Sequence, residues 1–527
     1  MKSIFDTYNS LITIFCCLGK TPADQANLSA IQFTLNTKYQ IIRDIFGYSA
    51  SGIFSQGLGI ITVFVVARLL GPSDFGILNG ASLVLVYGAY MELGALSTMG
   101  RDLPYCYGKG DMEKAAVIEG AARRTTIFGA LVATLFIIAF SFLPIHSAKM
   151  ALGLQAMAVV LILQNVYTYH RTVLRSHNCF RELSQQQVLL AAVTLVLAIL
   201  YAVYLGFEGR LIAAIMAQAV ILLYALHRNP WVAVPKFNLS EAWSVIRVGL
   251  PILMSGFVLS LLATIDRLMV ITFLGETQLG YFGLAVLLTS AVTLIPAIAS
   301  QVLYPRITHQ FGVSGNNVEA LRTFVLTPPA ILSALLPILI GALYLSLPLV
   351  VSVLLPAYMP GVAAARIIVI GIFFYGILGL TDYFLVTINK LKQYALFGCV
   401  ALFLNIVLDY LFLQLGYGIE GIALGGTLIT YFFYSSIVIG YSLFHYTKRI
   451  GDWVRYFTWL WLPFVYMIVL LWIVELAIDH MLPSASNTEL LFSTFAKVIV
   501  YMLFCLPLMF VVFRKLKLDF SKLSLIR

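Results

Sequence analysis

The sequence predicts an all-α polytopic membrane protein with about 14 transmembrane helices, arranged as two parallel six-helix repeats plus an appended helix pair. Three observations predict this fold. Of the 527 residues, 61% are hydrophobic and only 11% are charged, whereas a soluble protein carries about 25% charged residues. Fourteen stretches are apolar over the roughly 20 residues that a spanning helix needs. Finally, two short phrases recur at similar spacing, which is typical of a duplicated membrane unit.

The repeated phrases lie at equivalent ends of apolar runs. Leu70-Gly71-Pro72-Ser73-Asp74-Phe75-Gly76 ends one run, and Leu274-Gly275-Glu276-Thr277-Gln278-Leu279-Gly280 ends another, 204 residues further on. Gly206-Phe207-Glu208-Gly209 and Gly418-Ile419-Glu420-Gly421 open two more segments, 212 residues apart. Because six spans is an even number, both repeats begin on the same side of the membrane. They are therefore parallel repeats related by an axis along the membrane normal.

The fourteen predicted spans are, in chain order, 46–69, 77–99, 125–144, 150–170, 186–205, 210–227, 249–273, 279–303, 323–345, 362–387, 394–414, 420–444, 457–477 and 492–513. The first six form a predicted N-lobe over 45–228 and the next six a C-lobe over 249–445. Spans 13 and 14 lie within 446–513.

Three further segments are expected to lie outside the spans. Residues 1–44 read as a cytoplasmic N-terminal extension, because their apolar stretch is too short to span and lacks a convincing signal-peptide cleavage site. Residues 229–248, between the lobes, are predicted to form an amphipathic linker on the inner membrane surface. Residues 514–527 read as a basic cytoplasmic tail.

The distribution of basic residues predicts the orientation. About 27 of the 33 Lys and Arg residues fall in alternate connections, on the side of the N-terminus. We therefore expect a multi-pass membrane protein with both termini in the cytoplasm. The net charge of +10 is then a topology signal facing anionic lipid and does not indicate a nucleic-acid partner. The six cysteines show no metal-ligand spacing, so we expect no metal site and no disulfide framework.

Ionisable residues inside the predicted spans are candidate functional residues, because each costs at least about 2.5–3.5 kcal/mol on insertion scales. Asp266 and Arg267 adjoin in the seventh span, where neighbouring side chains point about 100° apart. One or both should therefore face a cavity or another helix; the alternative is a structural ion pair that ties the halves together. Arg68, Arg267 and Arg366 all belong to the outer half of the membrane. Facing one cavity, they would form a chamber that attracts phosphate or acidic sugars, although Arg68 could instead extend to the membrane interface.

Other polar residues complete the candidate site. Gln56 and Asn405 are candidates for contacts with sugars in this chamber. Candidates for ion coupling or charge pairing are Asp266, Glu92, Asp382 and Asp409. Asp382 could pair with Lys390 or Lys392, whereas Asp409 and Glu475 lie near outer helix ends and could simply reach water.

Several segments resemble the bacterial polysaccharide transporter family, which includes the O-antigen flippases. Ala67-Arg68-Leu69-Leu70-Gly71-Pro72-Ser73-Asp74-Phe75-Gly76 resembles the end of that family's first helix, and Asp266-Arg267-Leu268-Met269 is similar to its seventh. Ser300-Gln301-Val302-Leu303-Tyr304-Pro305-Arg306 resembles the inner end of the eighth. Leu404-Asn405-Ile406-Val407-Leu408-Asp409 and Gly416-Tyr417-Gly418-Ile419-Glu420-Gly421 resemble the eleventh and twelfth.

The resemblance implies membership of the multidrug/oligosaccharidyl-lipid/polysaccharide flippase superfamily, with two six-helix lobes around a cavity that opens alternately to each side. The implied cargo is an undecaprenyl-diphosphate-linked glycan, such as an O-antigen, capsule or exopolysaccharide unit. It would move from the inner to the outer leaflet of the bacterial cytoplasmic membrane. The implied partners are membrane lipids, a polysaccharide polymerase and glycosyltransferases. No cofactor is expected beyond coupling to a proton or sodium gradient. The appended helix pair resembles the arrangement of the lipid II flippases.

Three alternatives stay open. A drug/cation antiporter of the same superfamily would favour an acidic or aromatic chamber, and the three outer arginines argue against it. An integral membrane enzyme of polysaccharide biosynthesis would need a sizeable outer loop or clustered carboxylates near a nucleotide site, and neither is visible. A scaffold that docks partners through spans 13 and 14 would leave the charges within the spans unexplained. The sequence therefore favours a transporter over an enzyme.

Overall fold

The computed structural model describes residues 38–144, 147–229, 239–481 and 487–515, and every regular element in these ranges is a helix. This confirms the all-α polytopic class. The predicted extension up to residue 37, linker residues 230–238 and tail residues 516–527 lie outside the described residues.

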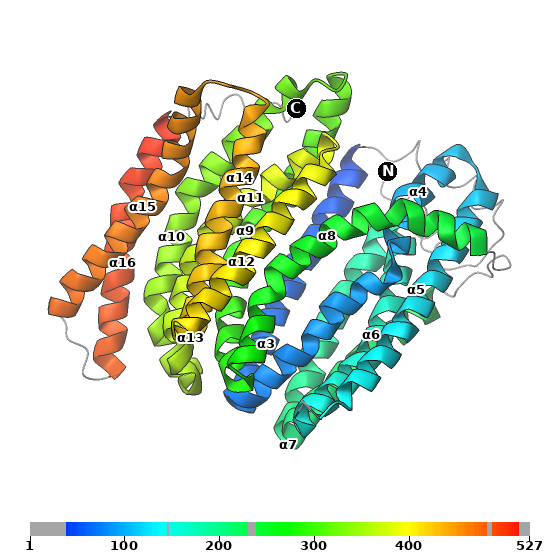
Figure 1. Ribbon diagram of the computed structural model, residues 1–527, viewed down its shortest axis with the longest axis horizontal. Helices are drawn as coiled ribbons and strands as arrows, with labels where there is room; N and C mark the ends of the chain where they lie inside the picture. Colours follow the sequence, from blue (N-terminus) through cyan, green and yellow to red (C-terminus); the bar gives the residue numbers. More distant parts are fainter. Residues whose placement is uncertain (1–37, 145–146, 230–238, 482–486, 516–527) are drawn as a thin grey trace, which may run out of the picture. The chain divides into compact units, whose positions relative to one another are not determined.

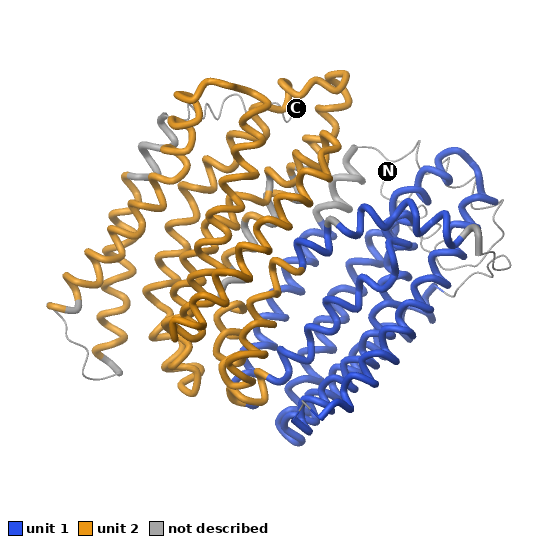
Figure 2. Tube along the Cα trace, viewed as in Figure 1, with its two compact units in different colours: residues 1–70, 77–260 blue, residues 71–76, 261–527 orange. Residues whose placement is uncertain are grey.

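The chain divides into two compact units (Figure 2). Unit 1 comprises the residues up to Leu70 together with 77–260, and unit 2 comprises 71–76 together with 261 onward. The two units divide within a helix, after Ser260, and the turn 71–76 belongs to unit 2. The boundary between the membrane lobes in the linker 229–248 stays a prediction.

The elements of unit 1 are labelled in Figure 1. They are α3 (Lys38–Gly88, apart from 71–76), η1 (Ala89–Glu92), α4 (Ala95–Lys109), α5 (Met112–Ser141), α6 (Ala148–Ser176), α7 (Phe180–Arg228) and the first part of α8 (Leu239–Phe273). Unit 2 holds the rest of α8, α9 (Glu276–Val313), η2 (Val318–Leu321), α10 (Arg322–Leu354), η3 (Pro356–Gly361), α11 (Val362–Thr387), α12 (Leu391–Gln414), α13 (Gly418–Ile422), η4 (Ala423–Thr430), α14 (Tyr431–Phe444), α15 (Ile450–Met481) and α16 (Asn487–Lys515).

The described helices account for the fourteen predicted spans. Eleven segments are long and apolar enough to cross a membrane. Two of them, Gly47–Glu92 and Phe180–Arg228, contain a non-helical glycine, Gly71 or Gly206, so each holds two spans. These segments therefore hold thirteen spans, and the 38-residue helix α9, which is the predicted eighth span, completes the fourteen.

Backbone geometry at the repeated phrases supports the duplication. Gly71 has φ 73° and ψ 173°, and Gly275 has φ 89° and ψ −179°. Residues other than glycine rarely adopt this backbone conformation. Gly206 and Gly418, the first residues of the second pair of phrases, likewise share positive φ values of 59° and 57°. The same turn therefore recurs after about two hundred residues.

Within unit 2 the two phrases also contact each other reciprocally. A Cβ atom on Gly76 would lie 1.8 Å from the carbonyl oxygen of Glu276, and one on Gly280 would lie 1.9 Å from that of Pro72. Adding 204 to 72 and 76 gives 276 and 280, so each contact is the repeat-related copy of the other. Only glycine permits this approach of the two backbones.

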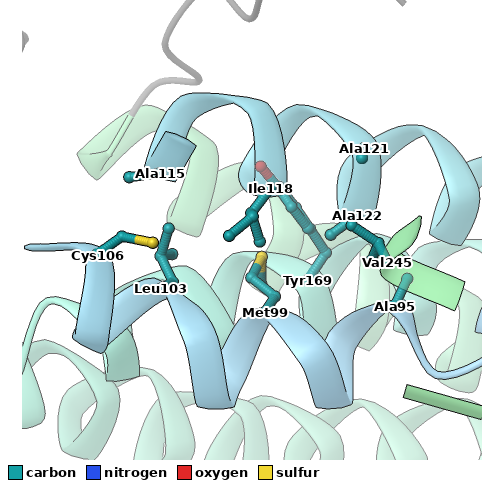
Figure 3. Close-up of a cluster of buried hydrophobic side chains, with 10 residues drawn as sticks. All are labelled: Ala95, Met99, Leu103, Cys106, Ala115, Ile118, Ala121, Ala122, Tyr169 and Val245. Carbon is teal, nitrogen blue, oxygen red and sulfur yellow. The ribbon is translucent and has the colours of Figure 1, made fainter. Parts of the chain in front are cut away.

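The second predicted span, 77–99, ends earlier than expected. Leu93 and Gly94 have φ values of 54° and 84°, so the chain turns there and starts the separate helix α4. One face of α4, with Met99 and Leu103, is buried in a cluster with side chains of α5, α6 and α8 (Figure 3). The helix therefore ends inside an apolar run, because Leu93 and Gly94 adopt left-handed backbone conformations.

The described end of the predicted linker, residues 239–248, forms a single helix with the seventh span. The helix α8 starts at Leu239 and passes Pro251 without interruption. In its first part Val245 is buried and Trp243 is exposed; an amphipathic position on the membrane surface stays a prediction. The Thr98 hydroxyl donates to the Val245 carbonyl over 2.7 Å, and this bond ties α4 to α8 within unit 1.

Candidate functional site

Asp266 lies on α8 in unit 2 and is almost fully buried, with 8% of its surface exposed. Its Oδ1 accepts a hydrogen bond from Asn405 Nδ2 at 2.9 Å, and its Oδ2 accepts one from Thr427 Oγ1 at 3.3 Å. The neighbouring Arg267 is half-buried and acts on Asp266 electrostatically. An amide of α12 and a hydroxyl of η4 therefore hold this carboxylate in place.

Asp409 brings a second carboxylate to the same cluster. It follows Asn405 by one helical turn on α12, and both residues are 0% exposed. Among the described residues, neither Asp409 oxygen nor Asn405 Oδ1 has a side-chain hydrogen-bond partner, and the backbone of Gly426 is the group that interacts with the Asp409 carboxylate. We call Asp266, Asn405, Asp409 and Thr427 the carboxylate cluster.

Two adjacent glycines bring the backbone against this cluster. A Cβ atom on Gly425 would lie 3.3 Å from Asp409 Oδ1, and one on Gly426 would lie 2.6 Å from Asp266 Oδ1. Both glycines belong to η4, a π-helical segment in which the Thr430 hydroxyl bonds to the Gly425 carbonyl, five residues back. Such π-helical turns within α-helices frequently occur at functional sites.

The carboxylate cluster suits a proton or a hard cation. Two carboxylates in a low-dielectric interior repel each other, so a shared proton or a bound cation stabilises them. The side chains offer only oxygen atoms toward such an ion, the type of donor that hard cations prefer. The oxygens of Asp409 and Asn405 that lack side-chain partners are available for this role.

Asp382 lies apart from that cluster, on α11. It interacts with the buried hydroxyl of Tyr394, which in turn interacts with Tyr434 on α14. In the described part of the chain, Asp382 meets Tyr394 rather than Lys390 or Lys392, so the expected lysine pairing is wrong. A tyrosine hydroxyl is the stabilising partner instead.

Arg366 forms a structural ion pair. Its Nη2 donates to Glu475 Oε1 of α15 over 2.8 Å, and the two side chains are 28% and 26% exposed. Tyr344 of α10 donates to the other Glu475 oxygen, and the guanidinium lies over the Tyr344 ring. The contact corrects two expectations, because Glu475 does not simply reach water and Arg366 is committed to a partner. The pair links α11 to the appended helix α15.

Glu92 caps a helix. Its Oε2 accepts from the Leu96 amide over 2.7 Å, and its carboxylate also interacts with the backbones of Gly94 and Ala95. The carboxyl group therefore lies at the positive end of the α4 dipole. We had expected a residue within a spanning helix that carries an ion or pairs with a charge. The structure shows a role in ending one helix and starting the next.

The structure unites some of the predicted site residues and separates others. Asp266, Asn405 and Asp409 meet in one cluster, whereas Arg366 and Asp382 have partners elsewhere in unit 2. Gln56 and Arg68 are exposed on α3 in unit 1, so a chamber shared with Arg267 stays a prediction. Thr427 was missed, although the adjacent Gly425-Gly426 pair inside an apolar span indicated a special backbone there.

Unit 1 contains a cavity of about 630 Å³ next to Glu92. Residues from α3, η1, α4, α6 and α8 line it, all within unit 1. No local sequence pattern predicts this cavity, because its walls come from three regions far apart in the chain: residues 82–97, Gln164 and residues 252–260.

The chain is similar to a protein family and to several solved structures. A family model described as "Polysaccharide biosynthesis protein" matches residues 65–362. No curated protein matches the chain. The lipid II flippase MurJ in an inward closed conformation aligns with a TM-score of 0.65 at 16% identity, covering 89% of this chain and 99% of MurJ.

Two further solved structures are similar. An outward-facing multidrug resistance MATE family transporter of the MOP superfamily has a TM-score of 0.57 at 15% identity, covering 76% of this chain and 95% of its own. A MOP superfamily transporter from Pyrococcus furiosus has the same score and identity, covering 77% and 95%. At these identities the structures establish a shared fold.

Proposed function

Because the chain belongs to the family of polysaccharide biosynthesis proteins, we propose that it is a flippase for a polyprenyl-diphosphate-linked oligosaccharide. The cargo, an O-antigen, capsule or exopolysaccharide unit, moves from the inner to the outer leaflet of the bacterial cytoplasmic membrane by alternating access. Three facts support this proposal: the family assignment, the many membrane-spanning helices, and a fold shared with a lipid II flippase and with MATE transporters.

The carboxylate cluster is the proposed site of energy coupling, and it is the observation that carries the transport mechanism. Asp266 and Asp409 bring two negative charges into one buried cluster, where oxygens of Asp409 and Asn405 lack side-chain partners among the described residues. A proton or a sodium ion bound there neutralises the repulsion. An ion that binds one conformation of unit 2 more tightly than another shifts the equilibrium between them, so an ion gradient can drive the cycle.

Arg267 is the proposed contact for the diphosphate. It is a half-buried arginine next to the coupling site, and guanidinium groups bind phosphate through charge-assisted, often bidentate hydrogen bonds. Arg267→Ala should block surface polysaccharide export at unchanged membrane abundance. Arg181→Ala, an exposed arginine at the start of α7, is the matched control and should export normally. Normal export by Arg267→Ala would remove this residue from the cargo site.

Deletion of the protein tests the proposed function. The expected result is complete lipid-linked oligosaccharide that accumulates in the cytoplasmic leaflet, where it stays protected from glycan-modifying reagents added outside. Expression of the full chain should restore its exposure on the outer leaflet.

The other outcomes distinguish the rival functions. Truncated oligosaccharides would indicate a biosynthetic enzyme. Sensitivity to cationic drugs with normal surface polysaccharide would indicate the antiporter that the MATE-like fold also permits. An unchanged distribution of complete lipid-linked oligosaccharide would refute the flippase proposal.

A further inference from the structure

The cavity in unit 1 has the size of a small-molecule site. Its volume of about 630 Å³ lies within the range of about 300–1,000 Å³ that is usual for ligand pockets. Polar side chains from five elements line it: Ser82, Tyr90, Glu92, Ser97, Gln164 and Ser260. Leu85, Val86, Ile252 and Leu253 add apolar walls.

The charge of the lining argues against a phosphate ligand. Every residue that lines the cavity lies in the described part of the chain, and none of them is Lys, Arg or His. Glu92 is the single ionisable carboxylate, and the amides at the start of α4 hold it. A diphosphate placed here would meet a carboxyl group and no compensating cation, which is unfavourable for a doubly charged ligand.

The neutral polar groups suit a ligand rich in hydroxyls. Ser260 and Tyr90 share a hydrogen bond, and the Tyr90 hydroxyl donates to the Gly256 carbonyl over 3.1 Å, so both are fixed in position. The side chains of Gln164 and Ser97 line the same cavity. An amide, three serine hydroxyls and a tyrosine thus lie beside leucine, valine and isoleucine side chains, a combination that matches the polar edge and apolar face of a sugar ring.

We propose that this cavity binds an uncharged or amino-bearing sugar of the lipid-linked glycan, and that the diphosphate binds outside it. The inference rests on the proposed flippase function, which it deepens by assigning the glycan's sugar part to unit 1. Gln164 and Ser97 donate or accept hydrogen bonds with sugar hydroxyls, and Glu92 accepts from a hydroxyl or an ammonium group.

Binding to the purified full chain tests the proposal with three probes. They are the lipid-linked glycan extracted from cells that lack the transporter, the free glycan released from it, and undecaprenyl diphosphate without sugar. Gln164→Leu and Ser97→Ala should each weaken binding of both glycan probes about tenfold, the effect of losing one well-placed hydrogen bond. Binding of undecaprenyl diphosphate should not change. Gln185→Leu, an exposed glutamine on α7, is the matched control.

The outcomes separate this proposal from the flippase function. Equal loss of undecaprenyl diphosphate binding, or unchanged glycan binding in both variants, would overturn the sugar site while wild-type flipping still supports the function. Glycan binding that depends on Gln164 in a protein that shows no flipping would uphold the sugar site and refute the function. A wild-type protein that binds no glycan probe would overturn both.

Discussion

Asp266 and Asp409 place two carboxylates in one buried cluster. The surrounding hydrogen-bond donors stabilise one of these carboxylates more than the other. Asn405 and Thr427 donate to Asp266, whereas Asp409 has no side-chain hydrogen-bond partner among the described residues. A buried carboxylate without a partner either takes up a proton or binds a cation. The occupancy of the carboxylate cluster should therefore govern the stability of unit 2.

Asp409→Asn should remove this dependence at small structural cost, because the amide has nearly the same shape and no charge. In detergent, the wild-type melting temperature should rise when sodium chloride replaces choline chloride, since an ion that binds the folded state stabilises it. The variant should melt at one temperature in both salts. If the wild type responds only to acidification, the coupling ion is the proton.

Glu113→Gln provides the control for this measurement. Glu113 is an exposed carboxylate in the first turn of α5, so its loss should leave the response to sodium intact. A sodium response that survives in Asp409→Asn would show that the ion binds elsewhere.

If Arg366 serves to pair with Glu475, its substitution should lower the stability of the protein and leave transport intact. Substitution of a cargo-binding arginine should have the opposite effects. Because both side chains are about one quarter exposed, breaking the pair should cost about 1–2 kcal/mol, less than for a fully buried pair. Arg366→Gln and Glu475→Gln should lower the melting temperature to a similar degree. The double variant should lose less than the sum of the two.

Thermal unfolding of the four proteins measures this coupling. Surface polysaccharide export, normalised to the amount of folded protein, should stay near the wild-type value. Export that fails in Arg366→Gln but not in Glu475→Gln would return Arg366 to the cargo site.

At the scale of elements, the predicted helix ends were least accurate where backbone contacts decide them. The apolar pattern predicted α11 at its observed bounds, and the glycine phrases predicted the turns at Gly71 and Gly206. The apolar pattern predicted that the second span continues past Gly94, because an apolar run does not reveal the left-handed turn at Leu93 and Gly94. It also divided α8 in two, since Pro251 reads as a helix start but lies within a continuous helix.

The site residues, too, could be predicted from the sequence only as far as local patterns reach. Charges within apolar spans identified Asp266 and Arg366 as residues that need partners. For Asp409 the expectation that it could simply reach water is wrong, because its side chain is fully buried. The partners themselves come from helices more than a hundred residues away, so their identity depends on packing that no local pattern encodes.

The contact between α4 and α8 predicts an unusually sensitive glycine. A Cβ atom on Gly249 would lie 1.8 Å from the Gly94 carbonyl oxygen, so Gly249→Ala must push the two helices apart. We expect a loss of about 1–3 kcal/mol, the usual range for overpacking, and a lower yield of folded protein in size-exclusion chromatography.

Gly57→Ala is the matched control for that variant. Gly57 lies within α3 and has no atom within 4 Å of the position where a Cβ would be, so alanine should be neutral or slightly stabilising through its higher helix propensity. Equal yields of the two variants would contradict the close packing of α4 on α8.

At the scale of the whole molecule, the basic residues predict which ends of the helices face the cytoplasm. The helix α9 offers a direct test, because Thr277 at its start and Val313 at its end are both exposed. Positive-inside reasoning places Thr277 outside the cell and Val313 in the cytoplasm. In intact cells, a membrane-impermeant maleimide should therefore label Thr277→Cys but not Val313→Cys. After permeabilisation it should label both, with the unsubstituted protein measuring the contribution of the native cysteines. Labelling of Val313→Cys in intact cells would invert the orientation and, with it, the proposed direction of transport.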